Sequence, residues 1–191
     1  MRLLNLKQNS AEWSQFRETK IGASDCPAIC GKDPFKTARA LFNQKFYKKN
    51  QWESPAMRRG KVLEPIAREM ISRMHGICYL PVVALHDTFD WMMASFDGYD
   101  QESNTIIEIK CPSDKKFEMI TFDGEIPIEY IYQVHHQMII ANTSKALLVP
   151  FNGLYYEEIP IYRDDEVVKE IMAKEQHFHE CLTRGEYAEP Q

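Results

Sequence analysis

The sequence predicts an α+β, or mixed α/β, fold built as a single domain over residues 1–191. Three observations support this prediction. The chain has 191 residues, of which 44% are hydrophobic, and this is enough for one sizeable core. No repeat, low-complexity tract or Gly/Ser linker divides it. Helical patterns fill the first 76 residues, and strand-like runs rich in β-branched and aromatic residues then begin.

Each N-terminal helical pattern has a start or stop signal. Ser10 can cap the first helix, and Ser24 or Asp25 can cap the second, which ends at Gly31. The longest pattern follows Ser54, and Pro65 removes one hydrogen bond within it and favours a bend. The predicted helices cover residues 10–20, 24–31, 37–49 and 54–76.

The rest of the chain alternates between strand and helix patterns. Three strand segments separated by polar turns predict an antiparallel meander over residues 77–110. A helical pattern then covers residues 127–142, two strand patterns follow it, and Asp164 caps an amphipathic final helix that ends near Gly185.

The charge is unevenly distributed along the chain. The net charge is −5, but residues 1–75 hold 15 Lys and Arg against 7 Asp and Glu, whereas residues 76–191 hold 8 against 21. Exposed charges are screened within about 8 Å at physiological salt, so a basic N-terminal surface can attract phosphates on an acidic protein. A solvated basic helix remains the alternative interpretation.

Cysteine usage and hydropathy predict a cytoplasmic protein with no membrane partner. The five cysteines form no C-x-x-C pair, which favours free thiols in a reducing compartment. No apolar run approaches the roughly 20 residues that span a bilayer, and the first ten residues lack a signal-peptide core.

The segment SFDGYDQESNTIIEIKCP, residues 95–112, predicts an acidic hairpin. If QESN is the turn, paired residues have indices that sum to 205, which places Asp97 opposite Glu108 with Cβ atoms about 4.5–5.5 Å apart. Strand alternation adds Ser95 and Lys110 to that face, while Ile107 and Ile109 point into the core. The hairpin therefore concentrates polar groups on one face.

Paired carboxylates of this kind suit Mg²⁺ or Mn²⁺, which bind few protein oxygens when phosphate supplies other ligands. A cation would neutralise the repulsion between Asp97 and Glu108, and Lys110 could position a water or stabilise charge on phosphorus. The alternative is a surface hairpin with an ordinary cross-strand Glu–Lys pair.

An aspartate followed by a turn and E-x-K resembles the core of the PD-(D/E)xK nuclease superfamily. The chain is similar in particular to the phage lambda-type exonucleases of the YqaJ viral recombinase family. Five blocks carry this resemblance in the family's order: WSQFRETKIGASD, RRGKVLEPIA, SFDG, EIKCP and YIYQVHHQM. The resemblance implies a restriction-endonuclease-like core, in which a central mixed sheet is flanked by helices.

The resemblance also implies roles for ten residues. Asp97 would bridge two metal ions, Glu108 and the main-chain carbonyl of Ile109 would hold one of them, and Glu64 would contribute to the metal cluster and to catalysis. Lys110 and Gln133 would position the attacking water. Four residues would bind DNA: Trp13, Arg17, Ser24 and Ser95. Of these, Arg17 and the two serines would bind the terminal 5′-phosphate.

The implied function is a Mg²⁺-dependent exonuclease, with Mn²⁺ as a possible substitute, that degrades one strand of double-stranded DNA in the 5′-to-3′ direction. It would leave a 3′ single strand for phage-type recombination in a bacterial or phage-infected cell. A ring-shaped homotrimer and a single-strand annealing protein are the implied assembly and partner. A structure-selective or nicking endonuclease on the same fold is the alternative, followed by a non-catalytic DNA-binding protein.

The sequence departs from the family pattern at two positions: Phe96 replaces the proline before the aspartate, and His135 occupies the second glutamine position. The pairs His135–His136 and His177–His179 lack cysteine or carboxylate partners at structural-zinc spacing, so solvated or core histidines are expected. The cysteines do not reproduce the arrangement of the iron–sulfur nucleases related to this fold.

Overall fold

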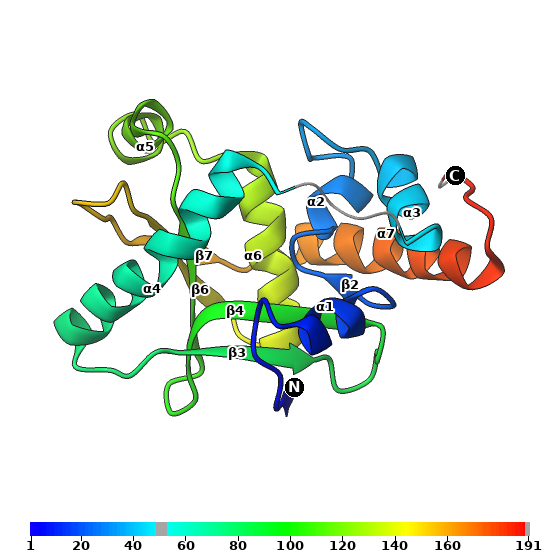
Figure 1. Cartoon of the computed structure of the whole chain (residues 1–191), viewed down its shortest axis with the longest axis horizontal. Helices are drawn as coiled ribbons and strands as arrows, with labels where there is room; N and C mark the ends of the chain where they lie inside the picture. The colour runs from blue at the N-terminus through cyan, green and yellow to red at the C-terminus, as the bar shows by residue number, and fades with distance from the viewer. Residues whose placement is uncertain (49–52, 190–191) are drawn as a thin grey trace.

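The computed structural model describes residues 1–48 and 53–189, and within them it has a mixed α/β fold (Figure 1). One seven-stranded sheet is surrounded by helices. The strands are β1 (Arg2–Leu4), β2 (Ile21–Gly22), β3 (Leu80–Leu85), β4 (Met92–Asp100), β5 (Thr105–Lys110), β6 (Lys145–Pro150) and β7 (Ile159–Tyr162). The helices are α1 (Ala11–Arg17), α2 (Cys26–Ile29), α3 (Ala38–Phe46), α4 (Pro55–His75), α5 (Asp114–Thr121), α6 (Ile128–Ala141) and α7 (Asp165–Arg184).

The sheet is mixed, as the family resemblance implied. Its strand order is β1-β3-β4-β5-β6-β7, and β2 pairs with β4 at the side. The predicted meander is present, because β3, β4 and β5 pair antiparallel. Strand β6 instead runs parallel to β5, since the chain returns through α5 and α6 before it enters β6.

Most of the predicted elements are confirmed, and the predicted caps explain several boundaries. Ser10, Ser54 and Asp164 each accept a main-chain N–H at the start of their helices. Helix α4 continues through Pro65. The predicted end of the third helix, Lys49, lies outside the described residues. Helix α5 and strands β1 and β2 were not predicted, because segments of eight, three and two residues are too short to show a periodicity.

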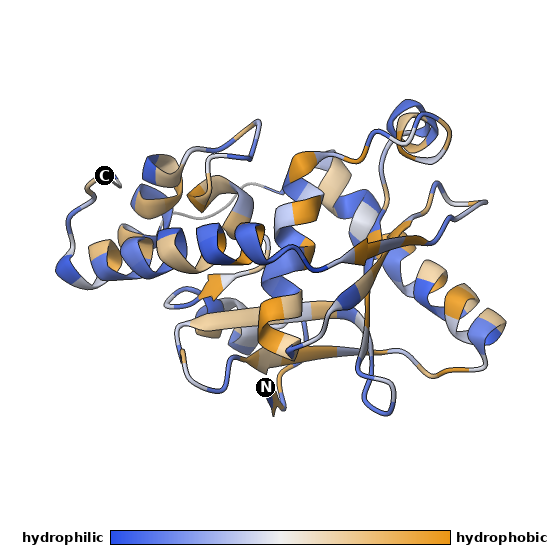
Figure 2. Ribbon diagram, turned by 180° about the vertical axis from the view of Figure 1, so that it is seen from behind, coloured by the Kyte–Doolittle hydropathy of each residue, from blue (hydrophilic) through white to orange (hydrophobic). Residues whose placement is uncertain are grey.

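Helices pack on both faces of β5, and its alternating side chains meet different neighbours. Ile107 and Ile109 belong to the apolar cluster that also contains Ala67 and Ile71 of α4. Ile106 belongs to the larger cluster that contains residues of α2, α3, α6 and α7. Figures 1 and 2 show α4 and α5 at one end of the long axis, α2, α3 and α7 at the other, and α6 between them. The central strands are mainly hydrophobic in Figure 2. The predicted inward direction of Ile107 and Ile109 is confirmed.

Among the described residues, none of the helices combines the length and the apolar character that a bilayer-crossing segment requires.

Candidate active site

The β4–β5 hairpin has the predicted register, but its regular ladder ends one pair early. The pairs Asp100–Thr105, Tyr99–Ile106 and Gly98–Ile107 all have indices that sum to 205. The next pair would be Asp97 and Glu108. The Asp97 carboxylate instead accepts the main-chain N–H of Ile109 at 2.9 Å. The predicted direct pairing of the two acids is therefore wrong in this detail.

A bulge in β4 explains why the ladder ends there. Against β3, Tyr99 pairs with Leu80 and Phe96 pairs with Val82, so Asp97 and Gly98 together lie opposite Pro81. A proline has no N–H to donate to the ladder, and an extra residue opposite it changes the direction of the bulged side chain. Gly98 is required at this bend, because a Cβ there would lie 2.4 Å from the Ile107 side chain.

Helix α6 holds Glu108 with two amide side chains. Gln133 Nε2 donates to Glu108 Oε1 at 2.5 Å, and Gln137 Nε2 donates to Oε2 at 2.6 Å. Lys110 Nζ lies 2.8 Å from Glu108 Oε1 and donates to Gln133 Oε1 at 2.7 Å. Glu108 is only 3% exposed, so these contacts replace its lost hydration. The sequence interpretation did not assign Gln137 to the site, yet Gln137 is buried and holds Glu108.

Helix α4 supplies Glu64 and a second contact to Asp97. Glu64 is half-buried, and Gly60, one turn earlier, leaves room for its carboxylate. Arg68, one turn later, donates from Nη1 to the main-chain oxygen of Asp97 at 2.8 Å. The sequence interpretation did not identify Arg68, because a contact between α4 and the β4 main chain has no local sequence signature.

The acidic groups disfavour one another in the absence of a cation. Burial, followed by the charges of Glu108 and Glu64, raises the pKa of Asp97 well above its ordinary value. Burial and Glu108 also raise the pKa of Glu64. Burial disfavours the Lys110 ammonium, but Glu108 and Asp97 outweigh this effect and raise the pKa of Lys110. Lys110 is therefore a cation at neutral pH in this structure.

The residues fit a hard divalent cation. Asp97, Glu64 and Glu108 offer carboxylate oxygens, the donors that Mg²⁺ prefers, and a cation beside them would reverse the unfavourable pKa shifts of the two acids. The three carboxylates do not form a closed cage, since their oxygens are not all within 4.8 Å of one another. Mg²⁺ usually keeps several waters, which suits an open donor set.

A second group of residues lies near the N-terminus of α2. Arg17 Nη2 donates to Ser24 Oγ at 3.0 Å, and the Arg17 guanidinium lies 4.8 Å from the centroid of the Trp13 ring. The Trp13 indole N–H donates to Ser95 Oγ at 2.8 Å. These contacts link α1 to β4 and bring together the four residues predicted to bind a 5′-phosphate and DNA.

Asp25 and Lys45 support this group and were not predicted to do so. Lys45 Nζ lies 2.9 Å from the buried Asp25 carboxylate, and Arg17 Nη2 lies 3.8 Å from it. Asp25 also accepts the Gly22 N–H at 3.0 Å. Burial disfavours the charged carboxyl, but Lys45 and Arg17 outweigh this effect and lower the pKa of Asp25 to about 2.

Asp25→Asn should destabilise the protein in a pH-dependent way. A pKa of about 2 against an ordinary 3.8 corresponds to about 2 kcal/mol of unfolding free energy. Because the folded-state pKa is lowered, this stabilisation is present above about pH 4 and is lost as the pH falls towards 2. The free energy of unfolding of the wild type and of Asp25→Asn should be measured in urea from pH 7 to pH 2.5. The difference between the two should shrink as the pH falls, and a difference that stays constant would contradict the assignment.

One cavity of about 980 Å³ contains both groups. Arg59 and Lys61, which belong to the basic N-terminal part, also line this cavity and add positive charge to it. All ten residues that the sequence interpretation selected line it: Trp13, Arg17, Ser24, Glu64, Ser95, Asp97, Glu108, Ile109, Lys110 and Gln133. Their individual roles remain predictions.

His135, which occupies the family's second glutamine position, does not face this cavity. Its Nδ1 contacts the main-chain oxygen of Ile131 at 2.8 Å, and its Nε2 accepts the Asp164 N–H at 3.0 Å. His135 therefore stabilises the junction between α6 and α7. The second amide at Glu108 comes instead from Gln137, two residues further along the helix.

Gly60→Ala should reduce activity with little change in stability. An added Cβ would lie 2.9 Å from Glu64 Oε1 and would displace that carboxylate, and a displacement of about 1 Å near a reacting centre can cost about 100-fold in rate. Alanine is favoured over glycine within a helix by up to about 1 kcal/mol. Turnover and thermal unfolding of the single variants and of the double variant with Glu64→Ala should be measured. An additive loss in the double variant would show that Gly60 does not act through Glu64.

The mixed sheet, the acidic hairpin and the lysine beside it define a protein of the PD-(D/E)xK superfamily fold. The chain belongs to the YqaJ-like viral recombinase domain family, whose model matches residues 12–144. It is 27% identical over 186 residues to YqaJ of Bacillus subtilis (strain 168), an alignment that covers 91% of this chain and 56% of that protein. The chain thus spans about half the length of this curated relative.

Solved structures show the same architecture. The alkaline exonuclease LHK-Exo of Laribacter hongkongensis is similar with a TM-score of 0.80 and 26% identity, over 92% of this chain and 94% of that one. Its complex with dAMP has a TM-score of 0.77, with the same identity and the same coverage. A phage-related exonuclease of Haemophilus somnus 129PT has a TM-score of 0.57 and 16% identity, over 86% of this chain and 96% of that one, and shows likeness of fold alone.

Proposed function

We propose that the protein is a Mg²⁺-dependent exonuclease that degrades one strand of double-stranded DNA from a 5′ end and leaves a 3′ overhang. The observation that carries this proposal is the shared cavity, in which Asp97, Glu108 and Lys110 lie together with Arg17 and Ser24. A cation site beside a phosphate-binding group suits hydrolysis of a phosphodiester near a chain end. Similarity to an alkaline exonuclease that was solved with dAMP supports the same reaction class.

The acidic residues hold the cofactor in this mechanism. Asp97, Glu108, Glu64 and the main-chain carbonyl of Ile109 would bind Mg²⁺, two ions for each site, and Mn²⁺ would substitute for it. When bound, Mg²⁺ supplies Lewis-acid activation of the phosphodiester and of the attacking water. The paired amides of Gln133 and Gln137 keep Glu108 in place.

Lys110 and Gln133 would position the attacking water for in-line displacement of the 3′ oxygen. Lys110 already touches Gln133 and Glu108 and is cationic, so it donates hydrogen bonds and stabilises negative charge on phosphorus.

The terminal 5′-phosphate would bind to Arg17, Ser24 and Ser95, with Trp13 fixing Arg17 and Ser95 in place. A guanidinium presents a forked set of donors that matches phosphate oxygens. Arg59 and Lys61 would contact the DNA backbone without reading bases, which makes cleavage independent of sequence. A homotrimeric ring around the DNA and a single-strand annealing protein complete the proposal, and both rest on the family resemblance.

The experiment that tests this function uses linear duplex DNA with one 5′-phosphorylated end and one 5′-hydroxyl end, each labelled, beside a covalently closed circle. With Mg²⁺, nucleotides should be released from the phosphorylated end while the circle stays intact, and EDTA should stop the reaction. Cutting of the circle would overturn the exonuclease assignment in favour of an endonuclease. Binding of the DNA without cleavage of either substrate would indicate a non-catalytic DNA-binding protein.

Arg17→Ala should weaken the preference for a phosphorylated end. The variant removes the forked donor. A charge-assisted hydrogen bond contributes about 1.5–3 kcal/mol, so loss of one such bond should lower kcat/KM on the phosphorylated end by about 10- to 100-fold. Cleavage from the hydroxyl end should change little. Arg73→Ala, which removes an exposed α4 arginine paired with Glu69, is the matched control. An equal loss on both ends would contradict phosphate recognition by Arg17.

A further inference from the structure

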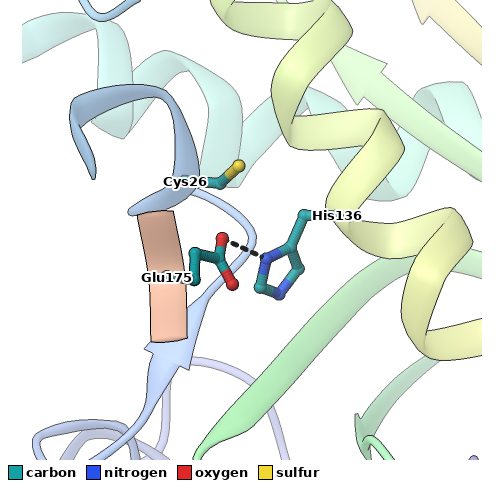
Figure 3. Close-up of side chains that lie close together, drawn as sticks. All are labelled: Cys26, His136 and Glu175. Carbon is teal, nitrogen blue, oxygen red and sulfur yellow. Dashed lines mark hydrogen bonds and ion pairs between the residues drawn. The ribbon is translucent and has the colours of Figure 1, made fainter. Parts of the chain in front are cut away.

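Three side chains from separate helices converge in the core (Figure 3). Cys26 begins α2, His136 lies in α6 and Glu175 lies in α7, and each has an exposed fraction of 0%. Their sulfur, nitrogen and oxygen atoms all lie within 4.8 Å of one another. Among the described residues, no other group of three His, Cys, Asp or Glu side chains comes this close. None of the three lines the active-site cavity.

The hydrogen bonds of His136 prepare one ring nitrogen for a ligand. Nε2 lies 2.9 Å from the main-chain oxygen of Met93, which can only accept, so Nε2 carries a hydrogen. Nδ1 lies 2.7 Å from Glu175 Oε1. A histidine that donates one N–H to a main-chain carbonyl and directs its other nitrogen at a carboxylate has an arrangement found in metal-bound histidines.

Glu175 provides an independent observation. Its second oxygen, Oε2, is buried and has no hydrogen-bond partner among the described residues. A buried oxygen without a partner is costly, and such atoms are rare in folded proteins. A cation bound between Glu175, His136 and Cys26 would satisfy this oxygen.

The charges of the three groups also match a divalent cation. A thiolate at Cys26, a carboxylate at Glu175 and a neutral imidazole at His136 carry two negative charges together, which a divalent ion cancels. No net charge would then remain in the core, and this is the condition under which buried charges are tolerated.

We propose that Cys26, His136 and Glu175 bind a zinc ion that joins α2, α6 and α7. Sulfur, imidazole nitrogen and carboxylate oxygen are the three donor types that zinc uses in proteins. The 2.7 Å between His136 Nδ1 and Glu175 Oε1 is a hydrogen-bond distance, whereas neighbouring ligands of tetrahedral zinc lie about 3.3 Å apart, so the Glu175 carboxylate turns on binding.

Zinc binding releases protons here. The thiol proton of Cys26 and the proton shared by His136 Nδ1 and Glu175 pass to solvent, and the bonds to zinc replace them. The consequence for the fold is local. Helix α2 follows directly after Ser24 and Asp25, and α6 carries Gln133 and Gln137, so the ion fixes the phosphate-binding group relative to the amides at Glu108.

The test uses the full chain, freed of metal by dialysis against a chelator and then titrated with Zn²⁺ or Co²⁺. About one zinc ion per chain should remain after gel filtration, and the melting temperature should rise by several degrees. The Co²⁺ form should show thiolate-to-cobalt charge-transfer absorption. In Cys26→Ser this absorption should be lost and the zinc content should fall to background.

Matched controls separate this site from the active site. Cys111→Ser removes the thiol that lines the active-site cavity, Cys78→Ser removes an exposed thiol, and Cys181→Ser removes a buried thiol from the core. All three, and Asp97→Asn, should retain the absorption and the ion. Nuclease activity is not among these readouts, so the result does not depend on the proposed function.

Two outcomes would overturn the proposal. Absorption that disappears in Cys111→Ser and persists in Cys26→Ser would place the metal in the active-site cavity. If the wild-type protein retains no zinc and shows no charge-transfer absorption, the cluster is a buried His136–Glu175 ion pair and not a metal site. The second outcome is decided on the wild type, so it does not require any variant to fold.

Discussion

Lys110→Met is expected to reduce the rate of DNA cleavage by at least about 100- to 1,000-fold, the cost of removing one preorganised donor from a developing negative charge. Lys110 is the cation in contact with both Glu108 and Gln133, and among the described residues no other lysine or arginine forms an ion pair or hydrogen bond with Glu108. Methionine keeps the length and apolar stem of the side chain, so the loss reflects the ammonium rather than a cavity.

Single-turnover cleavage in Mg²⁺ and DNA binding in EDTA should be measured on the same preparations. Binding should change less than threefold, because one phosphate contact among many contributes little to affinity. Lys116→Met is the matched control: Lys116 lies 4.7 Å from the Tyr130 ring and Lys110 lies 4.9 Å from it, yet Lys116 pairs with Glu129 instead of Glu108. Wild-type turnover in Lys110→Met would remove this lysine from the mechanism.

Asp97→Asn is expected to abolish Mg²⁺-dependent cleavage and to stabilise the metal-free protein. The amide oxygen can still accept the Ile109 N–H, so the local main chain is retained. The substitution removes a carboxylate whose pKa is raised by burial and by Glu108 and Glu64, and with it an unfavourable charge. Loss of the proposed central metal ligand should cost about 1,000-fold or more in rate, since a bound metal contributes several kcal/mol to the transition state.

The stability gain should depend on pH with a defined sign. An acid whose folded-state pKa is raised holds its proton more tightly in the folded protein, so wild-type stability falls as the pH rises above the ordinary value of 3.8 towards the raised one. The Asp97→Asn variant has no carboxyl group at this position, so its stability does not fall in this way as the pH rises. Melting temperatures in EDTA should therefore diverge with rising pH, and added Mg²⁺ should raise the melting temperature of the wild type alone. A less stable Asp97→Asn at every pH would contradict this account.

The sequence predicted those parts of the fold and site that depend on local patterns. The β4–β5 register followed from one turn and a constant index sum, because the strands are adjacent in the chain. Glu64 and Gln133, which lie 33 positions before and 36 after Asp97 in the sequence, were placed through the family resemblance and not through spacing. The structure brings them into the same cavity as the hairpin.

The missed features depend on contacts between distant segments. The bulge at Asp97 arises from its pairing with β3 at Pro81, and Arg68 reaches Asp97 from a separate helix. Gln137 and Gln133 have the same polar character in the sequence, and only the packing of α6 on the sheet shows that both face Glu108. The partners of His136 are equally remote, since Glu175 is 39 positions away and Cys26 is 110. No local spacing rule could have joined them.

The two amides at Glu108 have a consequence for how the site responds to pH. Glutamine side chains do not titrate, so the two amide donors that hold this carboxylate neither gain nor lose a proton as the pH changes. The two histidines of α6 that could have introduced a neutral-pH transition, His135 and His136, are turned to α7 and β4 instead. Raising the pH therefore ionises Asp97 and Glu64 without changing the protonation of the two amides that hold Glu108.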